Sequence, residues 1–130
     1  MQTYLDFKMK DDVLVVDIAG DLDHHQAAQA REEIDKTIDT FKTKHLVMDF
    51  SKVEFMDSSG IGVVMGRYNK VKEKGGNIVL IGCSKYVTLI LEMAGIFTIV
   101  SSRDSLDEAF QELISTKDND EELEGAEDGK

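Results

Sequence analysis

Apolar residues are distributed along this chain in two recurring patterns. Short apolar or alternating runs, bounded by polar residues or glycine, are typical of β-strands, whereas stripes at three- and four-residue spacing are typical of amphipathic helices. Strands are therefore expected at Thr3–Met9, Val13–Ala19, His45–Phe50, Asn77–Gly82 and Phe97–Val100. Helices are expected at residues 25–41, between Asp57 and Gly75, and at residues 85–94 and 105–114.

The order of these elements predicts the fold class. Lys10, Asp11 and Asp12 separate the first two strands, so a short turn and an antiparallel hairpin are expected there. From the second strand onward strands and helices alternate, which implies parallel strands joined by right-handed crossovers. The sequence thus predicts a single α/β domain with a mixed, mostly parallel sheet, an antiparallel edge strand and about four helices. A polar turn at Ser51 and Lys52 is expected to end the third strand before the short apolar piece Val53–Met56.

Each expected helix has an apolar stripe that should face the sheet. The second helix also holds Gly62 and Gly66, four residues apart, for which close packing of helix on sheet is the expected reason. Its far end is basic and is expected to be a solvated face, although it could pair with an acidic partner; the residues are Arg67, Lys70, Lys72 and Lys74. The predicted inward positions are Ala27, Ala28, Ala30, Ile34, Ile38, Phe41, Ile61, Val64, Met65, Tyr68, Val71, Val87, Ile90, Leu91, Ala94, Leu106, Ala109, Phe110, Leu113 and Ile114.

Composition changes sharply near the C-terminus. Residues 117–130 contain seven acidic residues and two lysines with almost no apolar side chain, so we expect a disordered acidic tail behind one domain at residues 1–116. The formal net charge of −11 makes nucleic acid a poor partner, because its phosphates would be repelled. No apolar run has membrane-spanning length and no leader is evident, so a cytoplasmic protein without a membrane partner is expected. The single cysteine, Cys83, follows an apolar run and is expected to be a small buried residue.

Two polar segments follow expected parallel strands. Residues 20–25 (GDLDHH) and residues 57–60 (DSSG) should lie at the same edge of the sheet, where α/β proteins place their sites. Asp57, Ser58 and Ser59 stand where a helix begins, and serine and aspartate are good N-caps. A helix start also has free backbone N–H groups and a positive dipole end, which would stabilise a phosphate. Chemistry alone does not choose between Ser58 and Ser59 as its acceptor.

Three segments together identify a family. FMDSSGIGVVMGRY at residues 55–68, GDLDHHQAAQARE at residues 20–32 and MAGIFTIV at residues 93–100 resemble the STAS domain family, the anti-sigma factor antagonists. The three lie in the family's order and spacing, and the resemblance covers roughly residues 3 to 114. The pair His24-His25 after Asp23 resembles the sporulation branch more than the general-stress branch.

This resemblance implies a function in partner switching. The unmodified protein would bind an anti-sigma factor that is also a serine kinase, and so free the sporulation sigma factor. That kinase would phosphorylate Ser58, which the family's pattern places as the phosphoacceptor, and a serine phosphatase would restore the active form. The contact surface would include Asp23, Asp57, Ser58, Ser59 and Gly60. The protein would then be a substrate and a binding module with no catalytic residue, metal or cofactor of its own.

The sequence motifs for three other functions are weaker. A serine hydrolase is disfavoured because DSSG is not G-x-S-x-G and no histidine follows the serines in the α/β-hydrolase order. A metal-dependent phosphoesterase could use Asp21, Asp23, His24 and His25, but helix capping by the aspartates is favoured and further Asp/His motifs are missing. A nucleotide-binding regulator remains an alternative, although the phosphate loop G-x-x-x-x-G-K-[ST] is absent.

Overall fold

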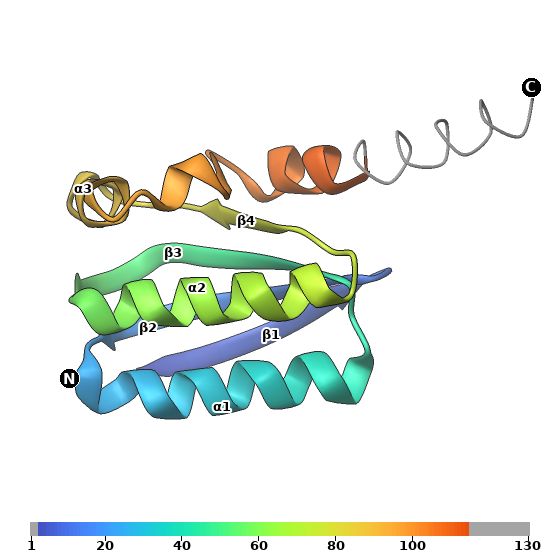
Figure 1. Ribbon diagram of the computed structural model, residues 1–130, viewed down its shortest axis with the longest axis horizontal. Coiled ribbons are helices and arrows are strands. Elements are labelled where there is room, and N and C mark those ends of the chain that lie inside the picture. The colour runs from blue at the N-terminus through green and yellow to red at the C-terminus, as the bar shows by residue number, and fades with distance from the viewer. Residues whose placement is uncertain (1–2, 115–130) are drawn as a thin grey trace, which may run out of the picture.

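Five strands form one mixed sheet in the computed structural model, which describes residues 3–114. The order is β1-β2-β3-β4-β5, with β1 antiparallel to β2 and every other neighbouring pair parallel, as the sequence predicts (Figure 1). A two-residue turn at Asp11 and Asp12 joins β1 to β2, and Asp11 takes a positive φ of 55° there. The strands are β1 (Tyr4–Lys10), β2 (Val13–Leu22), β3 (His45–Met56), β4 (Ile78–Ile81) and β5 (Ser101–Arg103).

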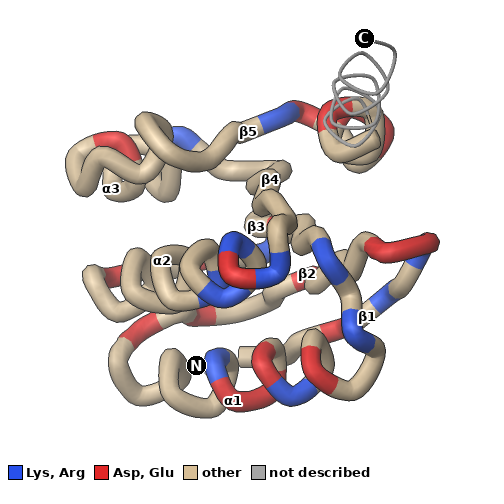
Figure 2. Tube along the Cα trace, turned by 45° about the vertical axis from the view of Figure 1, so that its right-hand side comes forward, with Lys and Arg blue, Asp and Glu red and all other residues tan. Residues whose placement is uncertain are grey.

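The helices cover the two faces of this sheet unequally. Helices α1 (His24–Phe41), α2 (Ser58–Glu73) and α3 (Lys85–Met93) contribute buried residues to one core, which lies on the face formed by Leu14, Val16 and Ile18 of β2. The helix over residues 106–114 packs on the opposite face, where Ala109 and Leu113 meet valines of β2, β3 and β4. Figures 1 and 2 show this division, with α1 and α2 side by side on one side of the sheet and the last helix on the other.

Two strand boundaries differ from the predicted ones. The turn expected at Ser51 and Lys52 is wrong, because β3 continues through both residues to Met56. Lys52 pairs with Ala19 of β2 after a shift of register, so backbone pairing holds a polar stretch in the strand. The strand expected at Phe97–Val100 is also wrong. Residues Ile96–Thr98 form a short 3₁₀ helix, and the edge strand β5 is the polar segment that follows it.

Four of the predicted inward positions are exposed instead. Ala28 and Ala94 are exposed, Phe41 is 55% exposed at the end of α1, and Ile114 is 49% exposed. In α2 the fully buried face is made by Val63, Val64, Arg67 and Val71, whereas Ile61, Met65 and Tyr68 are half-buried. The stripes predicted for α1, α3 and the last helix contain all of their buried residues and some exposed ones, whereas the stripe predicted for α2 misses the buried Val63 and Arg67.

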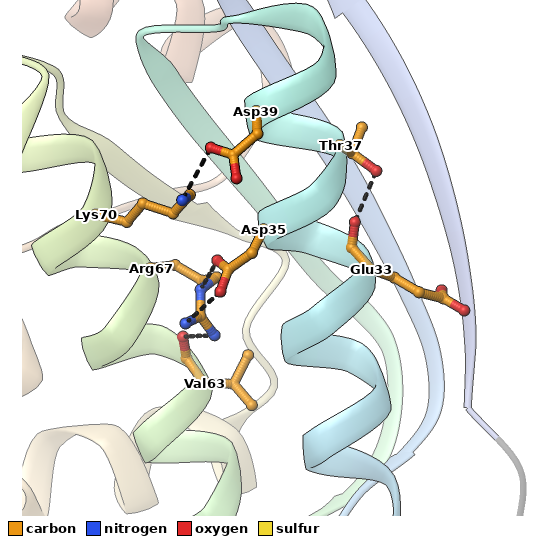
Figure 3. A network of polar contacts seen from close by, with 7 residues as sticks. All are labelled: Glu33, Asp35, Thr37, Asp39, Val63, Arg67 and Lys70. Carbon is orange, nitrogen blue, oxygen red and sulfur yellow. Dashed lines mark hydrogen bonds and ion pairs between the residues drawn. The ribbon is translucent and has the colours of Figure 1, made fainter.

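Arg67 is buried between α1 and α2, contrary to the sequence prediction. The sequence places it on a solvated basic face, but it is 5% exposed and forms an ion pair with Asp35 of α1, with 2.7 Å between Nε and Oδ1 (Figure 3). Its Nη1 also donates to the carbonyl of Val63, one turn earlier in α2, at 3.4 Å. A second ion pair, Lys70 to Asp39 at 2.9 Å, lies nearer the surface. The two pairs join α1 to α2 along their length.

Two sequence predictions concern the limits of the chain. The acidic tail at residues 117–130 lies outside the described residues, and the domain assigned to residues 1–116 is described up to residue 114. Among residues 3–114, no helix is both long and apolar enough to cross a membrane.

Candidate functional site

The strands β2 and β3 end side by side. Leu22 at the end of β2 pairs with Met56 at the end of β3, so the two polar segments that follow them meet at one edge of the sheet, as predicted. Asp23 and Asp57 are the next residues, and each stands immediately before a helix, α1 and α2 respectively. The described part of the chain also begins here, with the side-chain hydroxyl of Thr3 donating to the carbonyl of Asp21.

Both aspartates are N-caps. The Asp23 carboxylate accepts the backbone N–H groups of His25 at 3.0 Å and Gln26 at 3.1 Å. The Asp57 carboxylate accepts the N–H of Ser59 at 2.8 Å. A carboxylate at this position satisfies otherwise unpaired donors and lies in the favourable field of the helix dipole. The capping interpretation of these residues is therefore correct, and each negative charge is fixed at the end of a helix.

Ser58 and Ser59 differ in their surroundings. Ser58 is the first residue of α2 and is exposed, whereas Ser59 is half-buried. The N–H of Ser59 already donates to the Asp57 side chain, and the N–H of Gly60 donates to the Asp57 carbonyl at 3.0 Å. The expectation that these two N–H groups would be free for a phosphate is thus wrong. A group attached to Ser58 would instead be directed to the surface beside a carboxylate.

Gly60 is buried beneath the site. A Cβ atom at this position would overlap the side chain of Met56 and lie 3.2 Å from the carbonyl oxygen of Leu22. The first turn of α2 therefore approaches β2 and β3 more closely than any larger residue permits. Gly62 and Gly66 are different, because a Cβ at either position would meet nothing within 4 Å. The prediction that they serve close packing is wrong, and Gly60 is the glycine that does so.

An apolar groove runs from Ser58 toward α3. It is an open hollow of about 370 Å³ between the first turn of α2 and the last turns of α3. Beside it α3 exposes further apolar surface, with Met93 80% and Leu89 58% exposed. The helical pattern did not predict this groove, because Ile90 and Ala94 fall at positions expected to face the core. The lining residues are Asp57, Ser58, Ile61, Ile90, Met93 and Ala94.

Two partly exposed aromatic residues lie at the end of β3 and the start of α3. Phe55 is 46% and Tyr86 43% exposed, with their ring centroids 6.4 Å apart. The Tyr86 hydroxyl donates to the carbonyl of Met56 at 2.7 Å, which ties the start of α3 to the end of β3. Ser58 is therefore set at the edge of a fixed, partly apolar surface that includes both helices.

The histidines do not join these residues in a ligand set. His24 and His25 are exposed, with their rings 4.0 Å apart, and the neighbouring Asp23 carboxylate is engaged by the helix start. Within residues 3–114 no three His, Cys, Asp or Glu side chains are grouped so as to hold a metal ion.

Cys83 lies at the same edge of the sheet, after β4, and is half-buried. Burial raises the pKa of its thiol, a hydrogen bond with Ser102 opposes that rise, and the negative charge of Asp49 adds to it. The thiol is therefore held in its neutral, less nucleophilic form.

Comparison with known proteins decides the family. The model of the STAS domain matches residues 4–109. The chain belongs to the STAS domain family. Among curated STAS relatives, the anti-sigma F factor antagonist of Paenibacillus polymyxa is 37% identical over 101 residues, which cover 78% of this chain and 86% of the relative. The anti-sigma-B factor antagonist of Bacillus subtilis is 28% identical over 100 residues, covering 77% and 90% of the two chains.

Solved STAS structures show the same fold. The Bacillus cell fate determinant SpoIIAA (stage II sporulation protein AA) in its phosphorylated form superposes with a TM-score of 0.67 at 25% identity, covering 84% of this chain and 98% of SpoIIAA. Its unphosphorylated form superposes with a TM-score of 0.65, covering 86% and 98%. The resemblance inferred from the three sequence segments is thus confirmed, and the relatives are anti-sigma factor antagonists of both the F and B types.

Proposed function

We propose that this STAS domain is an anti-sigma factor antagonist that phosphorylation of Ser58 switches off. In its unphosphorylated form it binds an anti-sigma factor with serine kinase activity and thereby frees the sporulation sigma factor. The kinase transfers phosphate from ATP to the Ser58 hydroxyl, and a serine phosphatase removes it. The protein acts as a binding module and a substrate, and it supplies no catalytic residue or cofactor.

The observation that carries this proposal is the position of Ser58. It is exposed, it begins a helix, and it lines an apolar groove in a chain that is 37% identical to an anti-sigma F factor antagonist. The phosphorylated form of SpoIIAA, which shares the fold, supports a modification of this kind. The greater exposure of Ser58 favours it over Ser59 as the acceptor.

The surroundings of Ser58 explain why a phosphate would act on the partner rather than on the fold. A phosphoserine adds about −1.5 to −2 charges, and here it would stand next to the Asp57 carboxylate. The helix dipole offsets part of this repulsion, but the N–H groups of Ser59 and Gly60 already have acceptors. The added charge therefore remains directed outward, where it must be desolvated if a partner covers the groove.

The contact surface follows from the same geometry. We assign Asp23, Asp57, Ser58 and Ser59 to the surface that the partner covers, with the groove as the place for an apolar side chain of the partner. Gly60 is buried, so we assign it a structural role: the absence of a side chain there allows α2 to pack close to β2. Asp23 belongs with the others because Leu22 and Met56 are paired.

Two variants and one matched control test the proposal. The protein is incubated with the anti-sigma kinase of its own organism and ATP, and its intact mass and kinase affinity are measured. We expect one phosphate on the wild type and on Ser59→Ala, and none on Ser58→Ala, which should still bind the kinase. Ser58→Asp should bind at least about tenfold more weakly, which corresponds to about 1.4 kcal/mol. A phosphate that persists in Ser58→Ala, or Ser58→Asp binding like the wild type, would contradict the switch.

A further inference from the structure

Two features of the chain take no part in the proposed function. The first is a group of lysines at the end of the molecule opposite Ser58, here called the lysine end and defined as Lys10, Lys42, Lys44, Lys72 and Lys74. The second is the acidic segment at residues 117–130. Helix α2 has 16 residues and a length of about 24 Å, so the lysine end is remote from the phosphorylation site.

The fold gathers these lysines from three parts of the chain: the end of β1, the connection from α1 to β3, and the end of α2. Lys42 caps the C-terminus of α1, and Lys74 that of α2, with Lys74 Nζ donating to the Thr43 carbonyl at 3.4 Å. The N–H of Lys44 donates to the carbonyl of Asp12 at 2.9 Å, which ties this segment to the β1–β2 turn beside Lys10. Figure 2 shows blue segments gathered around the end of α2.

The lysine end has a positive net charge, whereas the whole chain is negatively charged. Five lysines stand against the carboxylates of Asp11, Asp12 and Glu73, whereas the complete chain carries −11. The dipoles of α1 and α2 favour cations at their C-terminal ends, which accounts for Lys42, Lys72 and Lys74. Lys10 and Lys44 lie outside the helices, so the dipoles do not account for them. Four of the five lysines are exposed and Lys44 is half-buried.

The last described helix leads the chain to the same end. Lys10 Nζ lies 5.1 Å from the centroid of the Phe110 ring. Leu113 packs in one cluster with Val13, which is the residue that pairs with Lys10. The last turn of this helix therefore lies beside the β1–β2 turn, and the acidic segment begins three residues after residue 114.

We propose that residues 117–130 bind the lysine end of the same molecule. The segment carries seven acidic residues and two lysines, a net charge of −5, opposite in sign to the lysine end. Residues 115–130 could extend by up to roughly 50 Å, at about 3.3 Å per residue. The path from the helix over residues 106–114 to α2 crosses the sheet and two packing layers of about 10 Å each, so the reach is sufficient.

This contact would screen the lysine end from other polyanions. Polyanions bind lysine clusters through non-specific electrostatic attraction, and a tethered acidic segment competes with them at a high effective concentration. The proposal is independent of the switch at Ser58, since the segment would bind at the far end of α2. Either can fail while the other stands.

Paramagnetic relaxation measures the contact in the full chain. A nitroxide is placed on the acidic segment through Ala126→Cys in a Cys83→Ser background, and amide signal intensities are compared with those of the reduced label. We expect the largest losses, about twofold or more, at residues 42–44 and 72–75. These losses should disappear at a salt concentration of about 1 M, where the Debye length is only about 3 Å.

A matched pair of double variants controls for charge alone. Lys42→Gln with Lys74→Gln should restore the signals, whereas Lys36→Gln with Lys85→Gln, which changes the net charge equally on other surfaces, should not. Losses spread evenly over the domain, losses centred elsewhere, or losses that survive Lys42→Gln with Lys74→Gln would overturn the proposal. So would losses seen only when labelled and unlabelled molecules are mixed, because the segment would then bind a second copy.

Discussion

The carbonyl oxygen of Leu22 lies 3.2 Å from the point where a side chain on Gly60 would begin. Leu22 ends β2 and Gly60 lies in the first turn of α2, so this approach sets how closely the two polar segments at the edge of the sheet are held. The spacing between the caps Asp23 and Asp57 thus depends on Gly60, which is buried.

Gly60→Ala should destabilise the fold by about 1–3 kcal/mol, because the added methyl group would overlap the buried Met56 side chain. Gly62→Ala is the matched control on the same helix, where a Cβ meets nothing. Alanine is the better helix former, so this variant should gain up to about 1 kcal/mol. Urea unfolding followed by circular dichroism measures both. Equal effects of the two substitutions would refute the close approach at Gly60.

Met93→Glu should weaken binding of the anti-sigma factor at least about tenfold without loss of stability. Met93 is 80% exposed and lines the groove beside Ser58, so the charge would stand where we expect an apolar side chain of the partner. Phe41→Glu makes the same kind of change at an exposed apolar residue on the end of α1. Calorimetric titration should show wild-type affinity for that control. If both variants bind alike, the groove is not the docking site.

Asp35→Ala should cost about 2–4 kcal/mol, whereas Asp39→Ala should cost less than about 1 kcal/mol. The Arg67 side chain is only 6% exposed. The first substitution therefore leaves a buried guanidinium charge without its carboxylate partner. The second removes a partner of Lys70 in a pair that is mostly in water, with the Asp39 side chain 61% exposed. Thermal and urea unfolding give both values. Similar costs would mean that the Arg67 pair behaves as a surface pair.

The raised pKa of Cys83 predicts both reactivity and a pH dependence of stability. Alkylation at about pH 8 should be slower in the folded protein than in urea, because less thiolate is present. The pKa of the Cys83 thiol is higher in the folded state than its ordinary value of about 8.5, so the protonated thiol stabilises the fold. The whole of this stabilisation is present below about pH 8.5. This stability is lost as pH rises through the folded-state pKa. Wild type should therefore lose free energy of unfolding relative to Cys83→Ala above about pH 8.5, and parallel curves would contradict the shift.

The fold class could be predicted from the sequence because long apolar stripes and turn residues agree with one another. The hairpin, the alternation of strands and helices, and the caps at Asp23 and Asp57 all followed from local pattern. The edge strand β5 did not, because Ser101–Arg103 is polar and is recognised only through its pairing with β4. Likewise Lys52 is in a strand because Ala19 of β2 pairs with it.

At the site, sequence patterns identified the residues but not their surroundings. The role of Gly60, the buried position of Arg67 and the groove between α2 and α3 each arise from contacts between distant segments. Gly60 meets Leu22 and Met56, Arg67 meets Asp35, and the groove combines the start of α2 with the end of α3. No local spacing distinguishes Gly60 from Gly62 or Arg67 from Lys70.

The position of Thr3 beside Asp21 has a practical consequence for how this protein can be handled. The described chain starts at the edge that presents Ser58, and it leaves the fold beside the β1–β2 turn, at the far end. A purification tag, fluorophore or sensor-chip linker joined at the N-terminus would thus crowd the very surface whose affinity is being measured. Attachment beyond residue 114, where the described chain ends at the opposite end of the fold, would leave that surface open to a partner in solution.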